Sequence, residues 1–181
     1  MIGKFFLFVK KGIEKCIRQY EITLFKTVGN NVYFGKNCTF SHKTISLGDN
    51  VYFGNNCVVQ SVHGEILIGN HVMFGPGVNI HGGNHKINQV GIYMDEVTKE
   101  YGEDPNIIIE DDVWIGANAI VLAGVHIHTG AVIGAGSVII KDVPAYAVVV
   151  GNPGSVIKYR FDEDTLKEHK TKMIIKREDL S

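Results

Sequence analysis

The sequence has few cysteines, no excess of either charge and no long apolar run. Its three cysteines show no CxxC spacing, which excludes a disulfide framework and a cysteine-based zinc site. Eighteen Lys and Arg against nineteen Asp and Glu leave a net charge of −1, so nothing in the composition favours binding to a nucleic acid backbone. The longest apolar run near the N-terminus, Phe5 to Val9, spans five residues, too short for a membrane span or a secretory signal. We therefore expect a soluble cytoplasmic protein without a nucleic acid partner.

Proline is also scarce, with 4 residues against 21 glycines, and this ratio indicates tight turns rather than stiff linkers. Apolar residues make up 45 % of the 181 residues, which is enough for a sizeable core and excludes general disorder. The length fits one domain with a small appendage.

An aliphatic residue returns every six positions, and this period determines the expected fold. The longest series is Ile109, Ile115, Val121, Ile127, Ile133 and Ile139. Small or β-branched residues lie four positions after them, at Val113, Ala119, Val125, Ala131 and Ser137. The same register occurs earlier in three sets: Val28, Phe34 and Phe40; Leu47, Phe53 and Val59; Ile68, Phe74 and Ile80. Neither the helical period nor the simple strand period produces this spacing, which is typical of a solenoid.

Each six-residue unit fits a short flat strand followed by a tight turn. The turns are rich in Gly and Asn, as in Gly35-Lys36-Asn37, and both residue types tolerate the positive φ that such corners require. Three strands closing into a triangular coil would stack equivalent positions in columns, with small side chains at the corners. The spacing therefore predicts a parallel β-helix over residues 27–151, in which Cys38 and Cys57 fill corners.

The segments outside the repeat have their own patterns. Residues 1–26 show helical spacing and carry six Lys and Arg against two Asp and Glu, a charge of +4. We expect this amphipathic helix to cap the first coil or to pack on a neighbouring subunit, the alternative being weak peripheral membrane contact. Residues 81–107 interrupt the repeat as a loop long enough to be functional. Residues 152–181 form a C-terminal tail with a helix from Asp162 to about Lys176.

The stretch that begins at Asp111 carries the most specific signature, DDVWIGANAIVLAGVHIHTGAVIGAGSVIIKDVPAYAVVVGNPGSVIKYR. It resembles the hexapeptide-repeat acyltransferases, in particular the sugar and capsular-polysaccharide O-acetyltransferases and the maltose/galactoside acetyltransferases. The resemblance covers roughly residues 28–160. It implies a left-handed parallel β-helix, a homotrimer and acetyl-CoA as the acetyl donor, with no metal.

The same resemblance implies roles for individual residues. In this family the long loop covers the active site of the neighbouring subunit, and its histidine matches His85 in GVNIHGGNHK. The positions that bind the coenzyme match Trp114, Gly116, Ala117, Ala135, Ile140, Lys141 and Lys158. Ser155 stands where many sugar acetyltransferases have Arg, so part of the phosphate recognition is unassigned, and Arg160 is a candidate substitute.

The chemistry of acetyl transfer is consistent with these roles. A hydroxyl that attacks a thioester needs a base, and the tetrahedral oxyanion needs a hydrogen-bond donor. An imidazole, with an ordinary pKa of about 6.5, suits the base near neutral pH, so we expect His85 to take the hydroxyl proton, with His81 as its rival. A backbone N–H of the Gly116-Ala117 turn would hold the oxyanion. Direct attack is favoured over an acyl-enzyme because no Ser or Cys adjoins His85.

Other features of the loop bear on the acceptor. The loop carries two Lys and five Asp or Glu, a charge of −3, together with Tyr93 and Tyr101, which suits a neutral hydroxylated acceptor such as a saccharide. Asp95, Glu96 or a backbone carbonyl would orient the ring of His85.

Four alternatives stay open. An acetyltransferase of this kind would also accept a xenobiotic of the streptogramin type or an amino sugar, the latter giving N-acetylation. A β-helical carbonic anhydrase would bind zinc through His63, His81 and His85. A non-catalytic scaffold would use none of these residues. Outside the carbonic anhydrase alternative, the remaining histidines are interpreted as solvated surface residues: His42, His63, His71, His126, His128 and His169.

Overall fold

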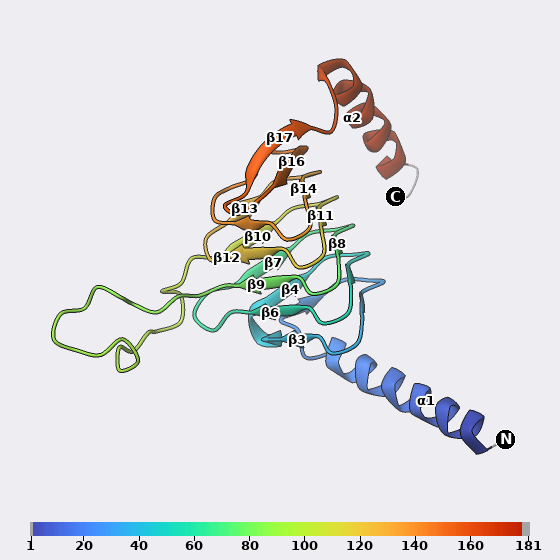
Figure 1. Ribbon diagram of the computed structural model, residues 1–181. Coiled ribbons are helices and arrows are strands. Elements are labelled where there is room, and N and C mark those ends of the chain that lie inside the picture. Colours follow the sequence, from blue (N-terminus) through green and yellow to red (C-terminus); the bar gives the residue numbers. More distant parts are fainter. Residues whose placement is uncertain (1, 179–181) are drawn as a thin grey trace.

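The structure is a computed structural model that describes residues 2–178 (Figure 1). Met1 and residues 179–181, which belong to the expected N-terminal and C-terminal segments, lie outside the described residues. The chain winds into stacked triangular coils with one helix at each end, α1 (Ile2–Ile22) and α2 (Glu163–Glu178). None of the helices in the described part is long and apolar enough to cross a membrane.

Each complete coil contributes one short strand to each of three sheets, so the expected parallel β-helix is confirmed. Sheet A contains β1 (Thr27–Val28), β4 (Ile45–Leu47), β7 (Ile66–Ile68), β10 (Ile107–Ile109) and β13 (His126–Ile127). Sheet B contains β2 (Tyr33–Phe34), β5 (Tyr52–Phe53), β8 (Met73–Phe74), β11 (Trp114–Ile115), β14 (Val132–Ile133), β16 (Ala147–Val150) and β17 (Ser155–Tyr159). Sheet C contains β3 (Thr39–Phe40), β6 (Val58–Gln60), β9 (Asn79–His81), β12 (Ile120–Leu122) and β15 (Val138–Ile139). A 3-10 turn, η1 (His42–Thr44), joins the first two coils.

Strand pairing is parallel between coils, and only β17 folds back antiparallel on β16. Ile108 pairs with His126, a separation of 126 − 108 = 18 residues, which is three six-residue units per coil. The side chains of the six-residue series point inward. Ile115, Val121 and Ile127 are fully buried, as are the corner residues Val113 and Ala119. The sequence period therefore identifies the core correctly through the upper coils.

The first coil departs from this expectation. Val28 is 37 % exposed and Phe40 is only partly buried, because no coil lies beneath them to complete the core. Phe25 closes this open end by packing its ring against those of Phe34 and Phe40, with centroids 6.3 and 5.3 Å apart. Residues just after α1, rather than most of α1 itself, therefore cap the first coil.

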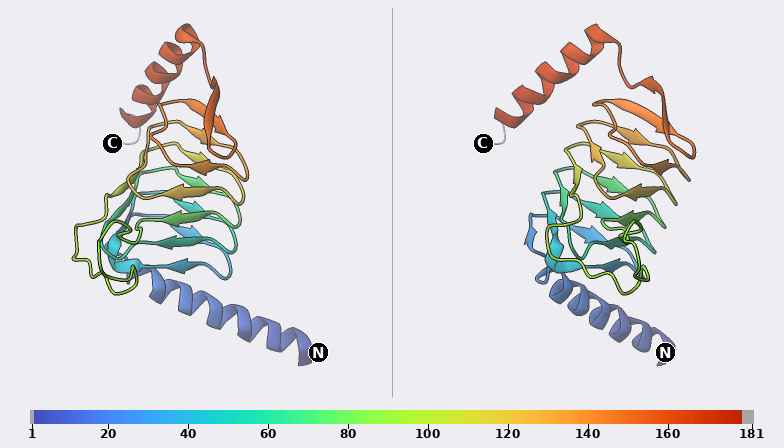
Figure 2. Two further views of the ribbon diagram at one scale, coloured as in Figure 1. Left: turned by 60° about the vertical axis from the view of Figure 1, so that its left-hand side comes forward. Right: turned by 90° about the vertical axis from the view of Figure 1, so that its left-hand side faces the viewer.

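Helix α1 points away from the stack of coils, as both views of Figure 2 show. Apolar side chains along it remain exposed, including Phe8, Ile13 and Tyr20. Near its C-terminal end, the guanidinium of Arg18 lies 4.8 Å from the ring centre of Tyr33. Packing of this helix on a neighbouring copy, or on a membrane, stays a prediction.

The Asn and Gly residues of the turns have different structural roles, whereas the sequence analysis gave both the same role, tolerance of positive φ. Asn37 and Asn56 have positive φ, at 56° and 59°, as expected for an amide side chain at a corner. Gly54 does not have positive φ. It is required because a Cβ there would lie 2.6 Å from the backbone nitrogen of Pro76 in the next coil. Close stacking, rather than φ, explains this glycine.

Candidate active site

The long loop, residues 82–106, leaves sheet C after β9 and returns to sheet A at β10, projecting to the side of the stack (Figure 1). Its departure is fixed by Ser61, which is buried and whose hydroxyl lies within hydrogen-bond distance of the carbonyls of Gly64 (2.7 Å) and Gly82 (3.0 Å). A Cβ at Gly82 would approach Ser61 Cβ to 2.5 Å, so only glycine fits at this departure point.

A nearly buried ion pair lies at the return end of the loop, and its lysine reaches back to the residues where the loop begins. Lys99 Nζ lies 2.5 Å from Asp104 Oδ1, and their side chains are 12 % and 8 % exposed. The same ammonium donates a hydrogen bond to the carbonyl of Asn84, the residue before His85. Lys99 therefore positions the backbone next to the candidate base. The sequence did not indicate this pair, because five acidic residues in the loop are available to two lysines.

Two cavities meet at the base of this loop. The inner one has a volume of about 360 Å³, and the outer one about 670 Å³. Asn84, His85 and Asp95 line both cavities. His81, at the end of β9, lines only the inner one. An acceptor held between loop and coils would therefore meet His85 from either cavity.

The other loop residues considered from the sequence occupy different positions. Tyr93 lines the outer cavity. The hydroxyl of Tyr101 instead donates a hydrogen bond to Glu65, and this bond raises the pKa of Tyr101. Among the side chains that the structure describes, none hydrogen-bonds to the ring of His85, so neither Asp95 nor Glu96 orients this ring within one chain.

The three histidines that the carbonic anhydrase alternative requires do not form a zinc site within one described chain. His63, His81 and His85 all line the inner cavity. They nevertheless do not bring three ligand atoms together, whereas among the described residues Glu110, His126 and His128 do. The three histidines of the carbonic anhydrase interpretation therefore do not form a metal site within the chain.

The residues expected to bind the coenzyme fall into separate groups. Trp114, half exposed on sheet B, leads into the Gly116-Ala117 turn, and Ala135 occupies the equivalent turn one coil higher. Ile140 and Lys141 are exposed and follow β15, at the opposite edge of sheet C. The loop of His85 departs from this same edge of sheet C, where the strands end, because β9, β12 and β15 stack in register.

The last coenzyme candidates lie near the C-terminal end of the coils. Lys158 is exposed on β17 opposite Val148. Arg160, the candidate substitute for phosphate recognition, pairs instead with Asp112 at 2.8 Å and donates to the carbonyl of Gly130. Its guanidinium therefore anchors the C-terminal segment to the coils.

The turn after β11 has an unpaired backbone donor. At the equivalent corner of the first coil, the N–H of Lys36 donates to the side chain of Asn55 in the coil above, at 2.8 Å. Above Ala117 stands Ala135, which has no side-chain acceptor. The N–H of Gly116 is used by the carbonyl of Ile133 at 2.8 Å, while the N–H of Ala117 finds no acceptor in the described part of the chain. A ligand oxygen at this corner would satisfy it.

We expect the loop anchor to be sensitive to loss of its lysine. Lys99→Met leaves Asp104 buried without a partner, and breaking such a pair typically costs roughly 3–5 kcal/mol. Local opening of the loop relieves this cost, so cleavage by chymotrypsin at exposed Tyr93 should accelerate by about 100-fold.

Lys86→Met is the matched control, because Lys86 and Glu103 are 35 % and 38 % exposed and such a pair contributes only about 0–1 kcal/mol. Equal cleavage rates in the two variants would show that Lys99 does not hold the loop.

Comparison with known proteins agrees with this architecture. The family model described as bacterial transferase hexapeptide (six repeats) matches residues 106–141, and that described as hexapeptide repeat of succinyl-transferase matches residues 27–61. A galactoside O-acetyltransferase of Lactococcus lactis is 37 % identical over 106 residues, 58 % of this chain and 48 % of the relative. The chain spans about half the length of this and the next curated relative.

Solved structures show the same fold. A maltose O-acetyltransferase from Clostridium difficile has a TM-score of 0.71 at 34 % identity, covering 80 % of this chain and 75 % of that one. A hexapeptide-repeat acetyltransferase from Vibrio cholerae, complexed with acetyl coenzyme A, has a TM-score of 0.72 at 29 % identity, covering 82 % and 79 %.

Proposed function

Because the chain belongs to the hexapeptide-repeat acetyltransferase family, we propose that it transfers an acetyl group from acetyl-CoA to a hydroxyl of a saccharide. The observation that carries the proposal is the position of His85, which lines both cavities at the base of the long loop. The named activities of the similar proteins, galactoside and maltose O-acetylation, support a saccharide acceptor.

The proposed reaction is one direct displacement. The imidazole of His85 takes the proton of the acceptor hydroxyl as its oxygen attacks the thioester carbonyl. The N–H of Ala117, unpaired within the described residues, donates a hydrogen bond to the developing oxyanion. The tetrahedral intermediate then expels the coenzyme thiolate, which takes the proton from the imidazolium. An ester and free coenzyme A are the products, and no side chain is acylated.

The proposed coenzyme groove runs past Trp114, Gly116, Ala117 and Ala135. Trp114 offers an exposed ring on sheet B for the pantetheine arm. Ile140 and Lys141 would line the far side of the groove, and Lys158 would approach the phosphates. Because sheet C separates Ile140, Lys141 and the loop of His85 from the Trp114 turn, one chain presents the parts of the site on two different edges.

A homotrimer would complete this site, with the loop of one subunit facing the Trp114 turn of the next. An exposed apolar column on sheet B supports such packing, since Tyr33, Tyr52, Met73 and Trp114 are paired in register and are each 43–50 % exposed. Light scattering should therefore give about three times the mass of one chain. A stable monomer that is fully active would refute the shared site.

An acceptor screen tests the proposed reaction. Purified protein is incubated with acetyl-CoA and a panel of neutral saccharides, amino sugars and hydroxylated xenobiotics, and release of free thiol is measured. We expect thiol release that depends on a neutral saccharide, with mass spectrometry showing an added acetyl ester. Release with amino sugars alone would assign N-acetylation, and release with no acceptor class would refute the acetyltransferase proposal.

A further inference from the structure

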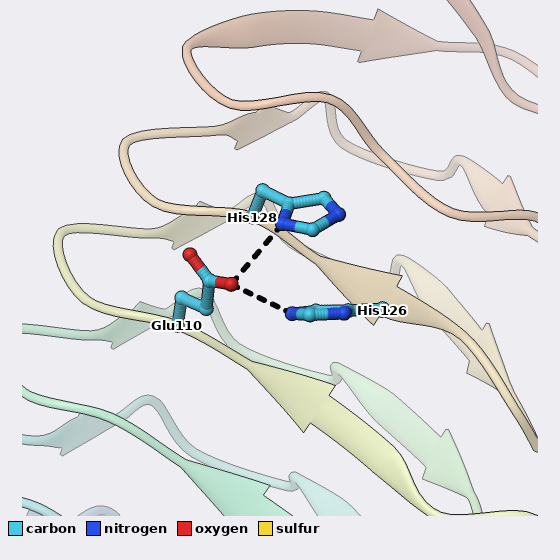
Figure 3. A group of neighbouring side chains, drawn as sticks. All are labelled: Glu110, His126 and His128. Atoms are coloured by element: carbon cyan, nitrogen blue, oxygen red, sulfur yellow. Dashed lines mark hydrogen bonds and ion pairs between the residues drawn. The ribbon is translucent and has the colours of Figure 1, made fainter.

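Glu110, His126 and His128 form a cluster on the outer face of sheet A (Figure 3). None of the three lines either cavity at His85. His126 Nε2 and His128 Nδ1 lie 2.8 and 3.1 Å from the same carboxylate oxygen, Glu110 Oε1. The two imidazole rings are stacked with their centres 3.9 Å apart. One ligand atom from each residue lies within 4.8 Å of the other two.

The stacking of coils brings these residues together. His126 and His128 flank Ile127, which is fully buried, so both imidazoles point outward on the same strand edge. Glu110 follows Ile109, whose partner on the next coil is Ile127, and this register places Glu110 beside His128. The regular stacking of the coils therefore places a His-x-His pair next to a carboxylate that directly follows the adjacent strand, β10.

Thr129 orients the carboxylate. Its backbone N–H and its hydroxyl both donate to Glu110 Oε2, at 2.8 and 2.6 Å, which leaves Oε1 directed at the two imidazoles. The hydroxyl of Thr129 is the main cause that lowers the pKa of Glu110 to about 2, with smaller contributions from the Thr129 N–H and both imidazoles. The carboxylate is thus anionic at neutral pH. Asp142 adds a further carboxylate nearby, which accepts the backbone N–H of His126 at 2.8 Å.

We propose that Glu110, His126 and His128 bind a divalent zinc ion, with Thr129 as the residue that positions the glutamate ligand. Two imidazoles and one carboxylate are a ligand set that zinc accepts, with a water molecule in the fourth position. Tetrahedral zinc with ligands at roughly 2.0–2.1 Å places them about 3.3 Å apart. The observed separations of 2.8 and 3.1 Å therefore need to widen by only a few tenths of an ångström.

The ion would act as a clamp between successive coils. His126 lies in β13 and His128 just after it, while Glu110 follows β10 in the preceding coil, so the bound ion would link these two coils. None of the three residues lines the cavities at His85. Because this ligand set is assembled only in the folded chain, binding should stabilise the fold. The inference is independent of the proposed acetyl transfer.

Calorimetric titration of the metal-free protein with Zn²⁺ tests the site. We expect one ion bound per chain, and a melting temperature that rises by roughly 5–10 °C at a free Zn²⁺ concentration about a hundred times the Kd. Thr129→Val should weaken binding by about 10–100-fold, the usual effect of removing the partner of a ligand. His126→Asn and His128→Asn should weaken it more. Substitution by Co²⁺ should give the intense visible absorption of four-coordinate cobalt.

Matched controls separate this site from other histidines. His71→Asn and His85→Asn should bind Zn²⁺ as the wild type does, and circular dichroism in the presence of a chelator verifies that each variant is folded. Absence of stoichiometric binding to the wild type would overturn the proposal. So would unchanged affinity in a folded His126→Asn/His128→Asn variant, or loss of binding in His85→Asn.

Discussion

His85→Ala should lower the kcat for acetyl transfer by about 10²–10⁴, the usual contribution of a positioned general base. Binding of acetyl-CoA should stay nearly unchanged, because the proposed coenzyme groove is built from Trp114 and the turns above it. The loss should therefore appear in kcat rather than in the KM for acetyl-CoA. Steady-state kinetics with a saccharide identified in the acceptor screen would measure both.

His81→Ala is the matched control for this prediction. His81 lines only the inner cavity, so its removal should affect acceptor binding more than turnover. Abolished turnover in His81→Ala with activity retained in His85→Ala would reverse the two roles.

Ala131→Leu should destabilise the protein by about 1–3 kcal/mol, the usual range for overpacking a core. Ala131 is fully buried at a corner, between Val113 in the coil below and Ala147 in the coil above, which are also fully buried. A larger side chain at this point has to separate coils whose spacing is fixed by backbone hydrogen bonds. For a chain of this size, the melting temperature should fall by roughly 2–4 °C per kcal/mol.

Ala145→Leu provides the same chemical change at an exposed position of the turn before β16. Thermal unfolding of this variant should match that of the wild type within about 0.5 kcal/mol. If Ala131→Leu also unfolds like the wild type, the corner assignment of Ala131 is wrong.

The fold could be predicted because the six-residue period leaves few alternatives. Buried positions such as Ile115 and Val121 recur with one spacing, and only stacked coils place them all inside. The prediction failed at Val28, because burial there requires a coil beneath it, and the described residues form none at that end. It also misassigned the reason for glycines such as Gly54, since the approach of the next coil is invisible in a local sequence. The winding sense came from the resemblance alone.

Part of the proposed zinc site could have been predicted from the length of one coil. Glu110 and His128 are 18 residues apart, which is one coil, so the period itself places them side by side. Interpreting each histidine separately as solvated concealed this pair. The Lys99–Asp104 pair could not be found in this way, because both residues belong to a loop without a period.

The sequence by itself determined the inward and outward faces of each coil and identified the loop that carries His85, because repetition converts a local pattern into a global arrangement. The tertiary structure decided which loop residues line the same cavities, which N–H stays unpaired at Ala117, and which oxygen of Glu110 faces the imidazoles. These features depend on contacts between residues that do not occupy equivalent positions of the repeat, or on the position of single atoms within one turn. Their geometry is set by the balance of burial, charge pairing and hydrogen bonding after the coils have stacked.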